Sequence, residues 1–220
     1  MLPAVPRKAK LGGQAEKLRQ LIQKLPVSDD GVKEALKLIK ACSTDELFAL
    51  GLQAPSPPVP AAVLNDSQQP VAAQLQAVQA VISSLQYNYA HGYFYNVSKA
   101  RPLSAILATA AAILRDPLPI KCIEAVFLGM LLTQGWSQGE LQRLPVGFKS
   151  MGPNRQVYRH IVLAVHAPCC GLYGALGISR RSNLMYKPLA FSSLAELLVD
   201  YQEAYRSWGH SVVKVLHPEP

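Results

Sequence analysis

Residues 117–132 read PLPIKCIEAVFLGMLL, and they constrain the fold more than any other stretch of the chain. The two prolines of this stretch fit poorly inside a helix, so helical structure can begin only near Ile120. After Cys122, apolar side chains cover nearly the whole circumference, and Glu124 carries the only charge. We therefore expect a helix that is buried on all sides and around which the core of the protein is built.

Cys122 falls in the first turn of this predicted helix. Unpaired backbone N–H groups and the positive end of the helix dipole favour a thiolate there, and Lys121 adds a neighbouring cation. The alternative is a structural cysteine, because free cysteine is among the most commonly buried residue types. Taken alone, the stretch favours the structural cysteine, so a nucleophile needs support from the rest of the chain.

Composition and charge narrow the class of protein. The chain has 220 residues, half of them hydrophobic, which suits one sizeable core with an appendage and excludes a disordered chain. The formal net charge is +8, and residues 86–191 hold eleven Lys and Arg residues against three Asp and Glu residues. This excess predicts an acidic partner. Nucleic acid would satisfy the charge, but the basic residues are scattered singly among apolar segments and do not form a nucleic-acid-binding helix.

Several other classes find no support in the sequence. The basic N-terminus is not followed by the apolar region of a signal peptide, and the apolar stretches are too short to span a bilayer. The four cysteines form no spaced framework, which favours a reducing, cytoplasmic setting. His166, Cys169 and Cys170 lack a second pair of metal ligands, and no cofactor motif is present. We expect neither a metal nor a cofactor.

The chain reads as three parts. Residues 1–52 form a helical N-terminal lead with apolar residues at helical spacing, in which Ser43 and Glu46 make a capping box. Residues 53–69 form a Pro-rich linker, and residues 70–220 form the main domain.

The main domain begins with helical patterns and continues with strand patterns. A last helix, capped by Ser193 and Glu196, precedes a closing strand. This order predicts an α+β fold, with helices in the N-terminal half and an antiparallel sheet in the C-terminal half. The predicted helices follow Pro70, Arg101 and Pro119, and the predicted strands are VGFKS, QVYRHIVLAV, LYGALGIS and SVVKVL.

A nucleophilic thiol needs a base within reach and a group that orients the base. His160 stands at the head of the strand-like segment IVLAV, 38 residues after Cys122, and the other four histidines fit this role less well. A structural histidine is the usual alternative on a strand, but the pairing with a first-turn cysteine makes the two interpretations comparable. Ser179, after the next strand, is a weak candidate for the orienting group when judged from the residues alone.

Seven blocks of sequence between residues 70 and 206 resemble, in order, the core of the vasohibins, which are tubulin tyrosine carboxypeptidases. The blocks are LQAVQAVISSLQYN, SKARPL, PLPIKCIEAVFLG, GFK, YRHIVLAV, YGALGISRR and LMYKPLAFSSLAELLVDYQEAY. The resemblance implies a papain/transglutaminase-like cysteine protease core with a Cys-His-Ser triad at Cys122, His160 and Ser179. The segment VHAPCCGLYG between His160 and Ser179 departs from the family pattern.

The resemblance also implies a substrate and the residues that bind it. The family removes the C-terminal tyrosine from the acidic tail of α-tubulin, which implies a cytoplasmic protein of the microtubule cytoskeleton. The resemblance implies a small vasohibin-binding protein as a helical partner of the N-terminal lead, and the alternative that these helices pack only on their own core stays open. The implied substrate-binding positions are Lys121 and Arg180 for the terminal carboxylate, Tyr87 for the scissile carbonyl oxygen, and Lys99, Lys149 and Arg159 along the acidic tail.

Elementary chemistry agrees with this assignment. Two cations beside the nucleophile would select a free carboxylate over an internal peptide bond, and separate lysines suit a flexible acidic tail. Two alternatives remain open, namely a catalytically inactive tubulin-binding scaffold and a transglutaminase-like acyl transferase.

Overall fold

The computed structural model describes residues 11–24, 28–52 and 69–216. The chain divides into two compact units, residues 1–55 and residues 56–220. Almost all of the predicted linker lies outside the described residues, as does Leu25.

The described residues of the first unit form three helices, α1 (Gly13–Ile22), α2 (Asp29–Ala41) and α3 (Thr44–Ala49). The predicted capping box is confirmed, because the Glu46 carboxylate accepts the Ser43 N–H at 2.9 Å and the Ser43 hydroxyl accepts the Glu46 N–H at 3.2 Å. Three apolar residues at helical spacing on α2 remain exposed, with exposed fractions from 36% to 49%: Val32, Leu36 and Ile39. The helix thus presents an apolar stripe that the described residues of this unit leave exposed.

The second unit holds four helices and five strands within the described residues. The helices are α4 (Val71–Ser84), α5 (Leu103–Arg115), α6 (Cys122–Leu132) and α7 (Leu194–Ser207); the strands are β1 (Gln142–Met151), β2 (Val157–Ala167), β3 (Leu172–Leu176), β4 (Lys187–Phe191) and β5 (Ser211–Leu216). The strands form one antiparallel sheet in the order β4-β3-β2-β1-β5. The predicted α+β fold is confirmed. None of the described helices is both long and apolar enough to cross a membrane.

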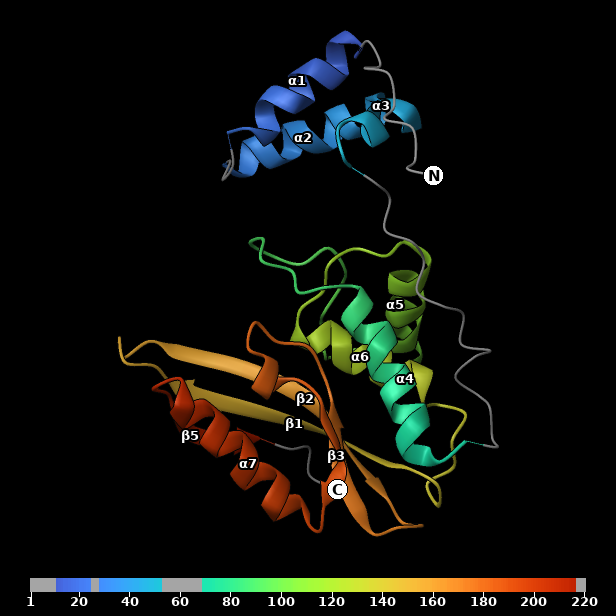
Figure 1. Ribbon diagram of the computed structural model, residues 1–220, viewed down its shortest axis with the longest axis vertical. Coiled ribbons are helices and arrows are strands. Elements are labelled where there is room, and N and C mark those ends of the chain that lie inside the picture. The colour runs from blue at the N-terminus through green and yellow to red at the C-terminus, as the bar shows by residue number, and fades with distance from the viewer. Residues whose placement is uncertain (1–10, 25–27, 53–68, 217–220) are drawn as a thin grey trace, which may run out of the picture. The chain divides into compact units, whose positions relative to one another are not determined.

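Two apolar cores lie on opposite faces of this sheet, and alternate residues of β2 contribute to each of them. Leu163 and Val165 join the core formed with α4, α5 and α6, whereas Val162 and Ala164 join the core formed with α7. Figure 1 shows α4, α5 and α6 gathered on one side of the sheet and α7 lying along the other side. The strand β2 is therefore sandwiched between α6 and α7.

The helix α6 is buried nearly all round, as its sequence predicts, with eight of its eleven residues buried. It packs closely against the sheet at Gly129, where an added Cβ would lie 2.8 Å from a methyl carbon of Leu163. This close approach holds the C-terminal half of α6 against β2, and Cys122 lies at the other end of the same helix.

Candidate active site

The segment before α6 anchors the start of this helix. Ile120 forms a parallel bridge with Tyr87, accepts the N–H of Asn88 at 2.7 Å and donates its own N–H to the Gln86 carbonyl at 3.1 Å. Gln86 adopts a left-handed φ of 62°, uncommon for a residue other than glycine, and so turns the chain directly after α4. These bonds place Tyr87 next to Cys122, the first residue of α6.

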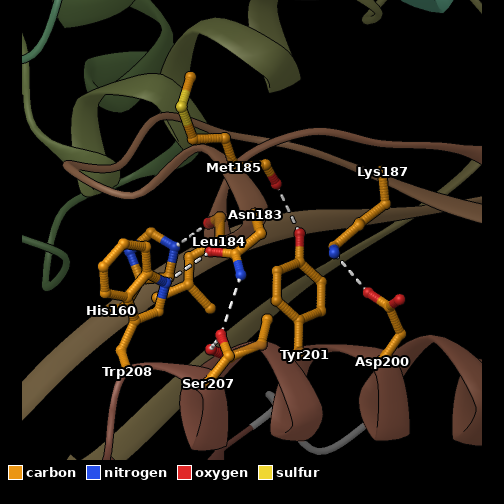
Figure 2. A network of polar contacts seen from close by, with 10 residues as sticks. His160, Asn183, Leu184, Met185, Lys187, Asp200, Tyr201, Ser207 and Trp208 are labelled. Carbon is orange, nitrogen blue, oxygen red and sulfur yellow. Dashed lines mark hydrogen bonds and ion pairs between the residues drawn. The ribbon is translucent and has the colours of Figure 1, made fainter.

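His160 is held by a backbone carbonyl. It lies on β2 opposite Phe148 of β1, and its Nε2 is 2.7 Å from the carbonyl oxygen of Leu184 (Figure 2). A carbonyl only accepts hydrogen bonds, so the proton of the neutral ring must reside on Nε2. The other ring nitrogen, Nδ1, is then unprotonated and can act as a base.

A cavity of about 430 Å³ brings most of the predicted site together. The cavity is also lined by Arg181, a residue that was not predicted from the sequence. The guanidinium of Arg181 lies 3.8 Å from the ring centre of Trp208. The predicted residues that line the cavity are Tyr87, Cys122, Arg159, His160, Ser179 and Arg180. These predicted residues come from four separate segments of the chain and meet around one thiol and one imidazole.

Three predicted lysines do not line this cavity. Lys121 donates its Nζ proton to the Ala90 carbonyl at 2.9 Å and lies over the ring of Tyr93. Lys99 lines a separate, largely apolar cavity of about 450 Å³. Lys149 lies on β1 directly opposite Arg159, so it is one strand away from a residue that does line the site.

Ser179 lies in the wall of the same cavity as His160, but its hydroxyl has another hydrogen-bond partner. Its hydroxyl accepts the backbone N–H of Arg181 at 3.2 Å, and in the described part of the chain no hydrogen bond joins it to His160. The imidazole is oriented instead by Leu184, which the sequence analysis missed. No residue type could have indicated this role, because every residue carries a carbonyl oxygen.

The backbone that leads to Ser179 is fixed from α4. The buried side chain of Gln79 donates to the Gly177 carbonyl at 2.8 Å and accepts the Gly177 N–H at 3.0 Å. Both backbone groups of Gly177 are thus paired with one amide across 98 positions of sequence. The loop that carries Ser179 and Arg180 therefore starts from a rigid point.

Burial controls the charge state of the thiol and the imidazole. It raises the pKa of the Cys122 thiol, although backbone N–H groups of Ile161 and of the first turn, with the charge of Lys99, act in the opposite direction. Burial also lowers the pKa of His160 to about 4, against a smaller opposing effect of the Leu184 carbonyl. The first-turn location therefore does not yield a standing thiolate, and both groups are neutral near pH 7.

Two comparisons identify what the chain resembles. The vasohibin family model matches residues 35–217, a span that contains every residue of the cavity. Tubulinyl-Tyr carboxypeptidase 1 of Mus musculus is 41% identical over 189 residues, which are 86% of this chain and 46% of that relative. The chain thus spans about half the length of the curated relative that it matches.

Proposed function

The chain belongs to the vasohibin family, and from that premise we propose that it is a cysteine-type carboxypeptidase that removes the C-terminal tyrosine of α-tubulin. The observation that carries the proposal is the meeting, in one cavity, of a first-turn cysteine and a histidine whose tautomer is set for base catalysis. The name of the mouse relative, a tubulinyl-Tyr carboxypeptidase, supports the substrate and the reaction. The papain/transglutaminase-like character of the core, a cysteine on a buried helix facing a histidine on the adjoining strand, belongs to the same proposal.

The proposed reaction begins from a neutral pair. As the Cys122 sulfur attacks the carbonyl carbon before the terminal tyrosine, its proton passes to Nδ1 of His160. The Cys122 N–H and the Tyr87 hydroxyl stabilise the oxyanion that forms. Collapse of this intermediate expels tyrosine, whose amine takes the proton from His160, and leaves a thioester. Water, deprotonated by His160, then hydrolyses the thioester and restores the thiol.

Recognition of the free carboxylate is assigned to Arg180 with Lys121. Arg180 lines the cavity, and Lys121 directly precedes the nucleophile. Because Nζ of Lys121 is bonded to the Ala90 carbonyl, the lysine must turn from that partner to reach a substrate carboxylate. Such a cationic pair would favour a free acid and disfavour internal peptide bonds.

Binding of the acidic tail of the substrate is assigned to a row of cations on three neighbouring strands, here called the cationic row. Lys149 of β1 is paired with Arg159 on one side and with Lys214 of β5 on the other, so the three side chains share a face of the sheet. None of them forms an ion pair within the described ranges. With strands about 4.8 Å apart, the row extends about 10 Å from the cavity, the length of three extended residues. Lys99 lines the groove beside this row.

Lys214, which the sequence analysis did not single out, should recognise substrate charge. We expect Lys214→Ser to raise KM about threefold for a Tyr-terminated peptide with glutamates upstream, as an exposed ion pair of up to about 1 kcal/mol would. The KM for the same peptide with glutamines should not change. Arg206→Ser is the matched control, because Arg206 is exposed on α7, on the opposite face of the sheet. An equal effect of both substitutions would contradict the assignment.

The group that orients His160 is either Ser179 or the Leu184 carbonyl, and the two assignments predict different effects of Ser179→Ala on kcat. Since the imidazole is bonded to the carbonyl, Ser179→Ala should retain kcat within about tenfold, far from the loss expected for a base or nucleophile. Steady-state kinetics on a Tyr-terminated peptide measure this. A loss comparable with that of His160→Gln would restore the serine as the orienting group.

A pair of peptides tests the proposed function. The protein should release tyrosine from a peptide ending in Glu-Glu-Tyr and leave the C-terminally amidated peptide intact. A transglutaminase-like enzyme would instead attach an added amine, and an inactive scaffold would bind the peptide without reaction. Release of tyrosine amide at a similar rate would refute carboxylate recognition.

A partner and a location follow from the same proposal. The exposed stripe on α2, formed by Val32, Leu36 and Ile39, offers an apolar surface at helical spacing for the small vasohibin-binding protein. The proposed place of action is the cytoplasm, on microtubules. A soluble, fully active protein without any bound helix would argue against the partner.

A further inference from the structure

The carbonyl that orients His160 belongs to a short turn, residues 182–184, which lies beside α7. A turn of three residues has too few internal hydrogen bonds to hold one of its carbonyl groups in place. Its inner bonds are those of the Leu184 N–H to Arg181 and the Met185 N–H to Ser182. The position of the Leu184 oxygen must therefore be set from outside the turn.

Side chains of α7 and its C-cap tie down the residue on each side of Leu184 (Figure 2). The indole N–H of Trp208 donates to Oδ1 of Asn183 at 2.8 Å, and the Asn183 amide donates to the hydroxyl of Ser207 at 3.3 Å. On the other side, the hydroxyl of Tyr201 donates to the Met185 carbonyl at 2.6 Å. We call these four side chains, Asn183, Tyr201, Ser207 and Trp208, the α7 frame.

The frame is anchored by Tyr201. Tyr201 is fully buried, packs on Phe148 with ring centres 5.1 Å apart, and burial raises its pKa well above its usual range, so its hydroxyl remains a donor. Phe148 is the residue of β1 that pairs with His160. Trp208 is stacked under the guanidinium of Arg181. The imidazole and the carbonyl that orients it are thus both held by residues of one packed layer, which lies between the sheet and α7.

We propose that the α7 frame is a set of positioning residues that fixes the Leu184 carbonyl and thereby keeps His160 as the Nε2-protonated tautomer with Nδ1 free. This inference rests on the proposed function, because it assigns His160 as the base. It predicts that a change on α7, outside the cavity chemistry, alters the basicity of the imidazole. A scaffold role alone would alter only stability.

Two substitutions loosen the turn from opposite sides. Tyr201→Phe keeps the buried ring and removes the bond to Met185, and Asn183→Ala removes both bonds on the other side. Each should lower kcat about tenfold with KM within twofold, because a small displacement of a catalytic group costs rate and not binding. The acid limb of the kcat profile should move to lower pH, since the Leu184 bond raises the pKa of the imidazole. The double variant should lose more kcat, and show a larger shift of the acid limb, than either single variant.

Ile82→Val is the control for general destabilisation. Ile82 is fully buried on α4, in the other core, and its shortening should lower stability by about as much as loss of the tyrosine hydrogen bond. The control should leave kcat and its acid limb unchanged. Frame variants that behave like the control, or that keep the wild-type acid limb, would overturn the proposal.

The frame can be tested even where no tyrosine is released. Nitrogen NMR of the His160 ring reports its tautomer directly: the wild type should carry the proton on Nε2, and the double frame variant should show a mixture. An unchanged tautomer in the double variant would overturn the frame. Absence of tyrosine release by the wild type would count against the proposed function alone.

Discussion

Cys122→Ala should abolish tyrosine release, with kcat reduced by at least about 10³-fold, as expected for loss of a nucleophile. Alanine removes the only thiol of the cavity lining and keeps the helix, because alanine is the strongest helix former. The variant should still bind a Glu-Glu-Tyr peptide with an affinity near that of the wild type. Peptide release assays and fluorescence anisotropy measure the two effects separately.

The same thiol should react in a way that reflects its burial. Since burial raises the pKa of Cys122, alkylation by iodoacetamide should be slow at pH 7 and accelerate as pH rises into the alkaline range. Cys42→Ser with Cys169→Ser and Cys170→Ser isolates Cys122 for this measurement. Fast, pH-independent alkylation near pH 6 would reveal a standing thiolate and contradict the neutral pair.

His160→Gln should reduce kcat about 10³-fold, within the range attributed to a positioned base. Glutamine can still donate to the Leu184 carbonyl, so the turn should keep its place, but the variant has no basic nitrogen for the thiol proton. Retention of more than a tenth of wild-type kcat would exclude His160 as the base. The rate of tyrosine release from the free-acid peptide measures the kcat of this variant.

The histidine also predicts a stability change with a definite sign. His160 titrates near 4 in the folded protein and near 6.5 when unfolded, so only the unfolded chain binds its proton between these values. Stability should therefore fall as pH is lowered from about 6.5 to about 4. His160→Gln removes this contribution, and its Tm should decline less steeply over the same window. An equally steep decline would indicate that the imidazole is not kept neutral by burial.

The sequence predicted the part of the site that depends on local structure. Prolines before Ile120, and apolar residues all round the helix after Cys122 except at Glu124, identified α6 and its first turn, because these effects act within a few residues. The strand that carries His160 was identified in the same way. The strand β4 was missed because Pro188 argues against a strand, and it is tolerated there since β4 is an edge strand.

The rest of the site depends on pairings that no local pattern encodes. Lys214 joins the cationic row only because β5 pairs with β1 in one register, with a shift next to Lys149. The Leu184 carbonyl meets His160 because α7 holds the turn around it. The Cys122 thiol is neutral because burial outweighs the effect of the first turn, which sequence alone could not weigh.

Mass spectrometry of the α-tubulin C-terminal peptide, after incubation of tyrosinated tubulin with the protein, tests the central claim most directly. The wild type should shorten the tail by one tyrosine residue, and Cys122→Ala should leave it intact under the same conditions. Intact tails with the wild type, supplied with the small vasohibin-binding protein, would contradict the account, as would equal shortening by Cys122→Ala.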